Sequence, residues 1–427
     1  MSANQLSALY VQPAVAFGGA ERQAATNLPL LARQGIDVTA VVGPGTDLLG
    51  LLAERGIDDY VHAPAFDPEI YAEGLSRLTV PGRYVWSWAR SAALIADVAR
   101  QRAANVMFAA LPFGWIAATP AARKLGIPIV WRAGGTEMTT TQRVLLHAAL
   151  RVWRPDFLVC CSQAVRCVYE PIINTPAEVV LNGVDSDWFT PEAGNPAMLR
   201  PPGARVVVGF AARMAAQKRP NDFVHLAARL SRRFPDVACI AAGDGPLRSE
   251  AEARARALGA SNLRFVGYVE DMASLYRACD IFVLPSRSEG APNTVLEAMA
   301  TRRPVVVTDV PGTREIVRDE RDGLVFPIGD VDALEAQVAR LIESAELRDA
   351  IAGAALGRVR REFSARACAA RTAELLQAVT GGTASAEARG RTPRRSRPSP
   401  PTGSREKARA AARGARSRRR GTRGRGR

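Results

Sequence analysis

The chain has 427 residues, 47% of them apolar, which is enough to bury more than one hydrophobic core and excludes a single small module. Its net charge of +15 is concentrated in residues 381–427, where sixteen Lys or Arg stand against two Glu, which leaves +1 for the other 380 residues. The folded part therefore has no large electrostatic field of its own, and the overall charge does not indicate its main activity.

Short apolar runs typical of buried strands alternate along the chain with amphipathic stretches of helical length. In the first half these runs are 8–11, 38–42, 106–110, 127–131 and 157–161. In the second half they are 206–211, 238–242, 263–266, 281–284 and 304–308. The alternation predicts an α/β protein with two doubly wound, Rossmann-like domains, each built on a parallel sheet.

Residues 181–202 are rich in Asn, Asp, Gly and Pro and have little periodicity, so we place the connection between the domains there. The predicted first domain is 1–185 and the second is 186–362. After residue 379 the composition changes to Gly, Ser, Pro, Ala and Arg without large apolar residues, so a tail at 381–427 is expected to be disordered.

The sequence gives little indication of a membrane-spanning segment or a metal site. The uncharged stretch 103–122 is long enough to cross a bilayer, but Pro112, Gly114 and Pro120 favour a buried strand followed by a helix. The N-terminus does not have the pattern of a signal peptide. The six cysteines form no CxxC pair and there are only three histidines, so we expect a cytoplasmic protein with buried thiols and no metal site.

The strongest candidate site is the run 286–300, directly after the predicted strand 281–284. It reads as a loop with Glu289 and Gly290, then a helix opened near Pro292 that carries Glu297. Free backbone N–H groups at a helix start can hold an anion, Gly290 lets a ligand approach closely, and a carboxylate can accept two hydrogen bonds from a sugar diol. The alternative is an ordinary surface loop followed by a helix with a solvated Glu.

This run resembles the E-x7-E segment of family 4 glycosyltransferases, which have the GT-B fold of two Rossmann-like domains facing across a cleft. The resemblance implies that Glu297 binds the ribose of a nucleotide-sugar donor and that Glu289 lies against the donor sugar, as a catalytic residue. It also implies that the residues between them belong to the substrate site: Gly290, Ala291, Pro292, Asn293, Thr294 and Val295.

Two cations follow the predicted strand 206–211. Arg213 and Lys218 resemble the family's Arg-x4-Lys pair, which implies a catalytic role in stabilising the departing diphosphate without a metal. Taken alone, two cations after a strand are more often solvated. Other segments between residues 182 and 330 match the family in order and spacing, among them 182–185, 243–246, 310–317 and 322–327.

In the first domain, Gly18 and Gly19 lie between the first strand and the first helix and resemble the family's glycine-rich loop, which faces the donor diphosphate. One departure is that many members carry a histidine after the strand 127–131, where this chain has Arg132. We therefore place Arg132, Gly134 or Gly135 in contact with the donor, and we interpret His147 as a packing residue.

Further departures are Arg302 and Pro311, which stand where the family has glycines and put the identity of the donor sugar in doubt. The acceptor is expected near residues 60–90, where Trp86 and Trp88 could equally belong to the core. A final helix at 363–380 is expected to pack back on the first, acceptor-side domain, while 186–362 binds the nucleotide sugar.

The resemblance implies a retaining, metal-independent transferase that needs no cofactor besides its nucleotide-sugar donor and acts on a glycan, lipid-linked or small-molecule acceptor in cell-envelope glycan synthesis. Front-face attack is favoured, because no second carboxylate is an obvious nucleophile. The alternatives are a silent homologue that binds a nucleotide sugar, a GT-B epimerase, and a protein that binds nucleic acid or an anionic membrane through 381–427. Nucleic acid is disfavoured because the tail has no aromatic residue, whereas peripheral contact with the inner face of the cell membrane stays open.

Overall fold

The computed structural model describes residues 5–13, 18–43, 48–63, 80–138, 140–192 and 194–381, without the side chains of 80–86 and 141. All of these residues lie in one compact unit. The side chain of Trp86, part of the expected acceptor region and, apart from Gly381, the predicted tail fall outside the described residues.

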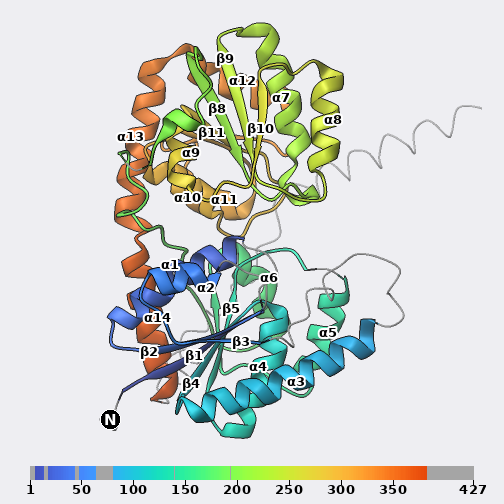
Figure 1. Ribbon diagram of the computed structural model, residues 1–427, viewed down its shortest axis with the longest axis vertical. Coiled ribbons are helices and arrows are strands. Elements are labelled where there is room, and N and C mark those ends of the chain that lie inside the picture. Colours follow the sequence, from blue (N-terminus) through green and yellow to red (C-terminus); the bar gives the residue numbers. More distant parts are fainter. Residues whose placement is uncertain are drawn as a thin grey trace, which may run out of the picture. The chain divides into compact units, whose positions relative to one another are not determined.

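The first sheet is entirely parallel and has seven strands in the order β3-β2-β1-β4-β5-β6-β7. Their bounds are β1 Ser7–Gln12, β2 Asp37–Val42, β3 Tyr60–His62, β4 Val106–Ala110, β5 Ile129–Ala133, β6 Phe157–Cys160 and β7 Ala177–Val179. The helices between them are α1 Gly19–Arg33, α2 Leu48–Glu54, α3 Val80–Gln101, α4 Pro112–Leu125, α5 Thr140–Leu150 and α6 Gln163–Ile173. Helices α1 and α2 lie on one side of this sheet and α3 and α4 on the other (Figure 1).

The second sheet is also parallel and has six strands in the order β10-β9-β8-β11-β12-β13. Its strands are β8 Val206–Ala211, β9 Val237–Ala242, β10 Leu263–Gly267, β11 Ile281–Leu284, β12 Val305–Thr308 and β13 Leu324–Phe326. The helices are α7 Pro220–Arg233, α8 Arg248–Leu258, α9 Met272–Ala278, α10 Asn293–Ala300, α11 Pro311–Ile316, α12 Val331–Glu343 and α13 Ala345–Glu362.

The two sheets confirm the predicted pair of doubly wound, parallel α/β layers. Strands β8, β11 and β12 are buried throughout, as expected for strands covered by helices on both faces. The strands β3, β7 and β13 are not predicted, because each is only three residues long and lies at a sheet edge, too short to give an apolar run. The stretch 103–122 forms β4 and most of α4, as expected.

The chain crosses between the two sheets twice, and the two crossings touch. Val184 forms a parallel bridge with Ser364, and a Cβ on Gly183 would lie 2.4 Å from Cα of Ala365. Beyond this point the last helix, α14 Ala365–Thr380, packs against α1 of the first sheet (Figure 1). Within the described residues, no helix is both long enough and apolar enough to cross a membrane.

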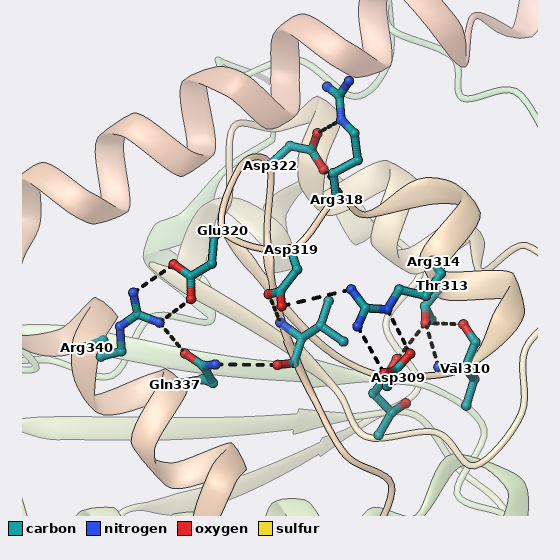
Figure 2. A network of polar contacts seen from close by, with 12 residues as sticks. Asp309, Val310, Thr313, Arg314, Arg318, Asp319, Glu320, Asp322, Gln337 and Arg340 are labelled. Atoms are coloured by element: carbon teal, nitrogen blue, oxygen red, sulfur yellow. Dashed lines mark hydrogen bonds and ion pairs between the residues drawn. The ribbon is translucent and has the colours of Figure 1, made fainter. Parts of the chain in front are cut away.

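The motif 322–327 has a structural role in the turn between α11 and β13 (Figure 2). Asp322 is fully buried and accepts hydrogen bonds of 2.6 Å from both the backbone N and Nε of Arg318. Asp319 accepts one from the backbone N of Val325, and Arg314 makes two hydrogen bonds to Asp309. These contacts fix the turn that leads into the edge strand β13.

Candidate functional site

The candidate residues lie where the strand order of each sheet reverses. β1 lies between β2 and β4, and β8 lies between β9 and β11. In open α/β sheets, ligands bind outside the carboxyl ends of the strands at this point. Gly18 and Gly19 follow β1, Arg213 follows β8, and Glu289 follows β11. The sheet topology therefore brings these segments of each domain to the place where a ligand is expected.

The two predicted cations occupy different environments. Nζ of Lys218 lies 2.6 Å from Oε1 of Glu289, whose side chain is 5% exposed against 21% for Lys218. Arg213 is exposed and its side chain has no hydrogen-bond or ion-pair partner among the described residues. Lys218 therefore neutralises a buried carboxylate, whereas Arg213 is available to an incoming anion.

Lys218 reaches Glu289 because the turn Ala216–Lys218 is bonded to the loop after β11. The backbone N of Arg287 donates to the carbonyl of Gln217 at 2.9 Å, and Nε2 of Gln217 donates to the carbonyl of Ser288 at 2.9 Å. Ser286, at the start of the same loop, is fully buried, and its Oγ has no hydrogen-bond partner among the described residues. The loop is thus held at two points and contains one unsatisfied hydroxyl.

Glu297 lies one turn into α10 and is almost fully buried. Its Oε2 accepts a hydrogen bond of 2.7 Å from Tyr276, and its Oε1 lies 3.4 Å from Nε of Arg22 in α1. Burial, followed by the Glu297 charge, raises the pKa of Tyr276 well above its ordinary value, so the phenol remains a donor. Burial lowers the pKa of Arg22, but Glu297 and neighbouring tyrosines outweigh it and the net shift is upward.

Asn293, the first residue of α10, joins the two halves of the site. Its Nδ2 donates to the carbonyl of Gly19 at 2.8 Å, and its Oδ1 accepts from Gln23 and from Asn182, both at 3.0 Å. Gln23 also donates to the carbonyl of Gly183 at 2.9 Å. A predicted substrate residue therefore contacts the glycine loop, α1 and the connection between the domains.

The glycine-rich loop at Gly18 and Gly19 leads into α1, and Glu21 in the first turn of that helix holds this loop in place. Oε2 of Glu21 accepts from the backbone N of Gly18 at 2.9 Å, and its Oε1 accepts from Gln12 at 2.8 Å. Burial raises the pKa of Glu21 above 4.5, although these hydrogen bonds oppose the shift. Gly18 and Gly19 are exposed, which leaves their backbone accessible to a ligand.

Arg132, the last residue but one of β5, is buried rather than open to solvent. Its Nη2 donates to Oδ1 of Asn182 at 2.8 Å, and Nδ2 of Asn182 donates to the carbonyl of Ala291 at 3.0 Å. Arg132 therefore supports the start of the 291–295 run through Asn182. Gly134 and Gly135 follow it and are exposed.

Glu137, in the loop between β5 and α5, contacts the loop after β11. It accepts hydrogen bonds from Ser288 Oγ at 2.6 Å and from Arg287 Nε at 3.1 Å. Partial burial raises the pKa of Glu137, but the bonds from Arg287 and Ser288 outweigh it and lower the pKa below 4.5. This carboxylate remains charged at neutral pH and lies beside the candidate catalytic loop.

The backbones around Gly290 are packed too tightly for a side chain. A Cβ on Gly290 would lie 2.5 Å from the carbonyl oxygen of Gly134, and a Cβ on Gly312 would lie 2.2 Å from that of Glu289. Gly312 is the second residue of α11, after Pro311. Glycine at these two positions is therefore required by close approach of the backbones.

The remaining predicted residues form the entry to α10. Pro292 precedes its first residue, Ala291 and Val295 are buried, and Thr294 is half-buried. Arg302 lies beyond the other end of this helix, is exposed and pairs with Asp349 of α13 at 2.7 Å. Among the described residues, no hydrogen bond or ion pair joins Arg302 to the residues above, and whether this departure from the family changes the donor sugar stays a prediction.

Sequence reasoning missed Arg22, Gln23 and Glu137 as members of this site. Arg22 and Gln23 directly follow the Gly-Gly-Ala-Glu run, which was the only signal available for them. Between α1 and α10 there is a cavity of about 10 Å³ lined by Arg22, Gln23, Asn293, Glu297 and others. Among the described residues, no group of three or more His, Cys, Asp or Glu is arranged to hold a metal ion.

Two family models match the chain, one in each half. Residues 17–188 match "Glycosyltransferase Family 4", and residues 205–344 match "Glycosyl transferases group 1". Together these matches include every strand of the two sheets except β1, and most of the residues described above.

Two curated relatives and one solved structure are similar to the chain. Alpha-D-kanosaminyltransferase of Streptomyces kanamyceticus is 34% identical over 35% of this chain and 39% of its own length. The lipopolysaccharide core biosynthesis mannosyltransferase LpsB of Rhizobium meliloti is 35% identical over 46% of this chain and 61% of its own length. The crystal structure of Anabaena HepE in complex with UDP and glucose superposes with a TM-score of 0.71 at 19% identity and covers 87% of this chain and 100% of that one. The match to each curated relative thus spans less than two thirds of that relative, and the structural match establishes the GT-B fold.

Proposed function

Because the chain belongs to the family 4 glycosyltransferases, we propose that it transfers a sugar from a nucleotide-diphosphate donor to an acceptor hydroxyl, with retention of anomeric configuration and without a metal. The observation that carries this proposal is a pair of contacts near the switch points of the two sheets: Asn293 bonds to Gly19, and Lys218 pairs with Glu289. A donor placed there lies against the carboxyl ends of both parallel sheets.

The donor-binding roles follow from burial and charge. Glu297 is a buried carboxylate suited to the two hydroxyls of ribose, and Glu289 is a buried carboxylate suited to the hydroxyls of the donor sugar. The accessible backbone of Gly18 and Gly19, at the start of α1, suits the diphosphate. Arg132 acts as a positioning residue, because it reaches the 291–295 run through Asn182.

In the chemical step, the bond between the sugar anomeric carbon and the diphosphate oxygen breaks, and its electron pair stays on that oxygen. The acceptor oxygen bonds to the same face of the anomeric carbon, and its proton passes to the departing phosphate. Arg213 and Lys218 stabilise the negative charge that develops on this phosphate. These two cations take the role that a metal has in other transferases, which is the basis of the proposed metal independence.

A donor screen tests the proposal. The full chain is incubated with UDP-, GDP-, ADP- and CDP-sugars, and the thermal shift and the release of nucleoside diphosphate are measured. One donor should raise the melting temperature and be slowly hydrolysed, and activity should survive EDTA. A folded protein that binds none of these donors would contradict the proposal. Binding without transfer to any acceptor would favour a silent homologue, and epimerised donor without acceptor would favour an epimerase.

For the acceptor we propose a glycan or lipid-linked saccharide of the cell envelope, with a small molecule as the alternative. The name of the LpsB relative places that protein in lipopolysaccharide core synthesis, whereas alpha-D-kanosaminyltransferase carries a different transferred sugar in its name. We further propose a cytoplasmic enzyme that contacts the inner face of the cell membrane through the basic residues 381–427. Deleting these residues should abolish binding to anionic vesicles and preserve turnover on a water-soluble acceptor.

A further inference from the structure

The carboxylate assigned to ribose already has partners on both of its oxygens. Tyr276 donates to Oε2 of Glu297 at 2.7 Å, and Arg22 lies 3.4 Å from Oε1. Tyr276 and Glu297 belong to α9 and α10 of the second sheet's domain, whereas Arg22 belongs to α1 of the first. In any motion of one domain against the other, Tyr276 therefore moves with Glu297, whereas Arg22 does not.

Among the described residues, the cavity beside this ion pair is too small for a nucleoside. The cavity between α1 and α10 measures about 10 Å³, which is about the space of one water molecule. Ligand pockets are typically at least an order of magnitude larger, at roughly 300–1,000 Å³. A ribose that bonds to Glu297 must therefore take the place of the Arg22 guanidinium.

We propose that Arg22 is a further residue of the donor site, which holds Glu297 in the absence of donor and is displaced from it by the nucleoside. The proposal rests on the assignment of Glu297 to ribose made above. Because the pair joins the two domains, its rupture links donor binding to the separation of α1 from α10. Arg22 thereby sets the affinity for the nucleotide without belonging to the chemical step.

The ion pair between Arg22 and Glu297 is strong enough to affect nucleotide binding, because the Glu297 side chain is 3% exposed and the Arg22 side chain is 23% exposed. A partly buried charge pair loses less to solvent screening than a surface pair does. The neighbouring contacts of Gln23 and Asn293 are between neutral groups and leave Glu297 untouched. Among these contacts between α1 and α10, the one that competes with ribose for Glu297 is therefore that of Arg22.

The test compares Arg22→Gln with Arg33→Gln, a control on the same helix whose exposed side chain has no partner among the described residues. Titration calorimetry measures the Kd of UDP and GDP for both variants and for the wild type. Loss of the competing charge should tighten binding of the accepted nucleotide about tenfold in Arg22→Gln, with no change in Arg33→Gln. Combining Arg22→Gln with Glu297→Gln should remove this gain.

Two results would overturn the proposal: equal affinity in Arg22→Gln and wild type, or weaker binding in Arg22→Gln, which would make Arg22 a direct ligand of the nucleotide. Hydrogen–deuterium exchange of the nucleotide-free proteins gives a second readout, in which Arg22→Gln but not Arg33→Gln should expose the amides at the start of α10. If the wild type binds neither nucleotide while this exchange still rises, the ribose assignment fails and the interdomain pair stands. If the exchange does not change, the pair does not hold the domains together.

Discussion

We predict that replacing Lys218 and replacing Arg213 have the same effect on turnover but different effects on the stability of the fold. Replacement of either residue by Ala should lower turnover by about a hundredfold or more, as is typical for the loss of a group aimed at developing charge. Only Lys218→Ala should also destabilise the fold, because it leaves the buried carboxylate of Glu289 without its cation.

The size of the stability effect follows from the burial of the pair. Removing one partner of a fully buried ion pair costs about 3–5 kcal/mol, and exposed pairs contribute about 0–1 kcal/mol. Glu289 is 5% exposed and Lys218 is 21% exposed, so we expect a loss of about 2 kcal/mol for Lys218→Ala. Arg213 has no side-chain partner among the described residues, and Arg213→Ala should stay within about 0.5 kcal/mol of wild type.

Urea denaturation and steady-state transfer measure the two effects on the same preparations. Arg256→Ala serves as the control, since Arg256 is an exposed arginine of α8 without a side-chain partner among the described residues. The variant that combines Lys218→Met with Glu289→Gln should recover most of the lost stability and none of the turnover. Wild-type stability in Lys218→Ala would refute the buried pair, and unchanged turnover in both single variants would remove the two cations from the mechanism.

Three further predictions concern other parts of the chain. Arg302 has φ +57°, a left-handed conformation that is unfavourable for a residue with a Cβ. Arg302→Gly should therefore raise the unfolding free energy by about 0.5 kcal/mol, even though it breaks the exposed pair with Asp349. A lower urea midpoint would contradict this prediction. Asp322→Asn should cost about 3 kcal/mol in the same assay, because Asp322 is a fully buried carboxylate, and a loss below about 1 kcal/mol would contradict it. Burial raises the pKa of Glu21 above 4.5 in the folded state, so its contribution to stability is present below pH 4.5 and is lost as the pH rises through the folded pKa. Glu21→Gln removes this titration, and the stability of the variant relative to wild type should increase from pH 4.5 to 7; a constant difference would argue against the shift.

The sheets could be predicted from the sequence because buried parallel strands leave continuous apolar runs. β8 and β11 coincide with the predicted runs at 206–211 and 281–284. The edge strand β3 could not be predicted in this way, since Tyr60 and His62 are exposed and the strand has no buried face to mark it. In β3, neither an apolar run in the sequence nor burial of the side chains marks the strand.

The candidate site was predicted only as separate segments. Glu289, Glu297 and Lys218 stand out because the loops around them resemble a family, but the resemblance does not say which side chains touch. The contact of Gln23 with Asn293 joins residues 270 positions apart and leaves no periodic signal. The role of Arg132 was likewise unpredictable, because it depends on a hydrogen bond to Asn182, which is 50 residues away in the sequence.

The bridge between Val184 and Ser364 holds the two crossings of the chain next to each other. Because α14 returns to α1, the whole second sheet with its helices is an insert within the first domain's chain, and the two ends of that insert are held side by side. An insert with adjacent ends can be exchanged for another without stretching its host. The half that we propose to bind the donor could therefore be replaced by the corresponding half of a relative, which should give chimaeras that change the donor and retain the acceptor.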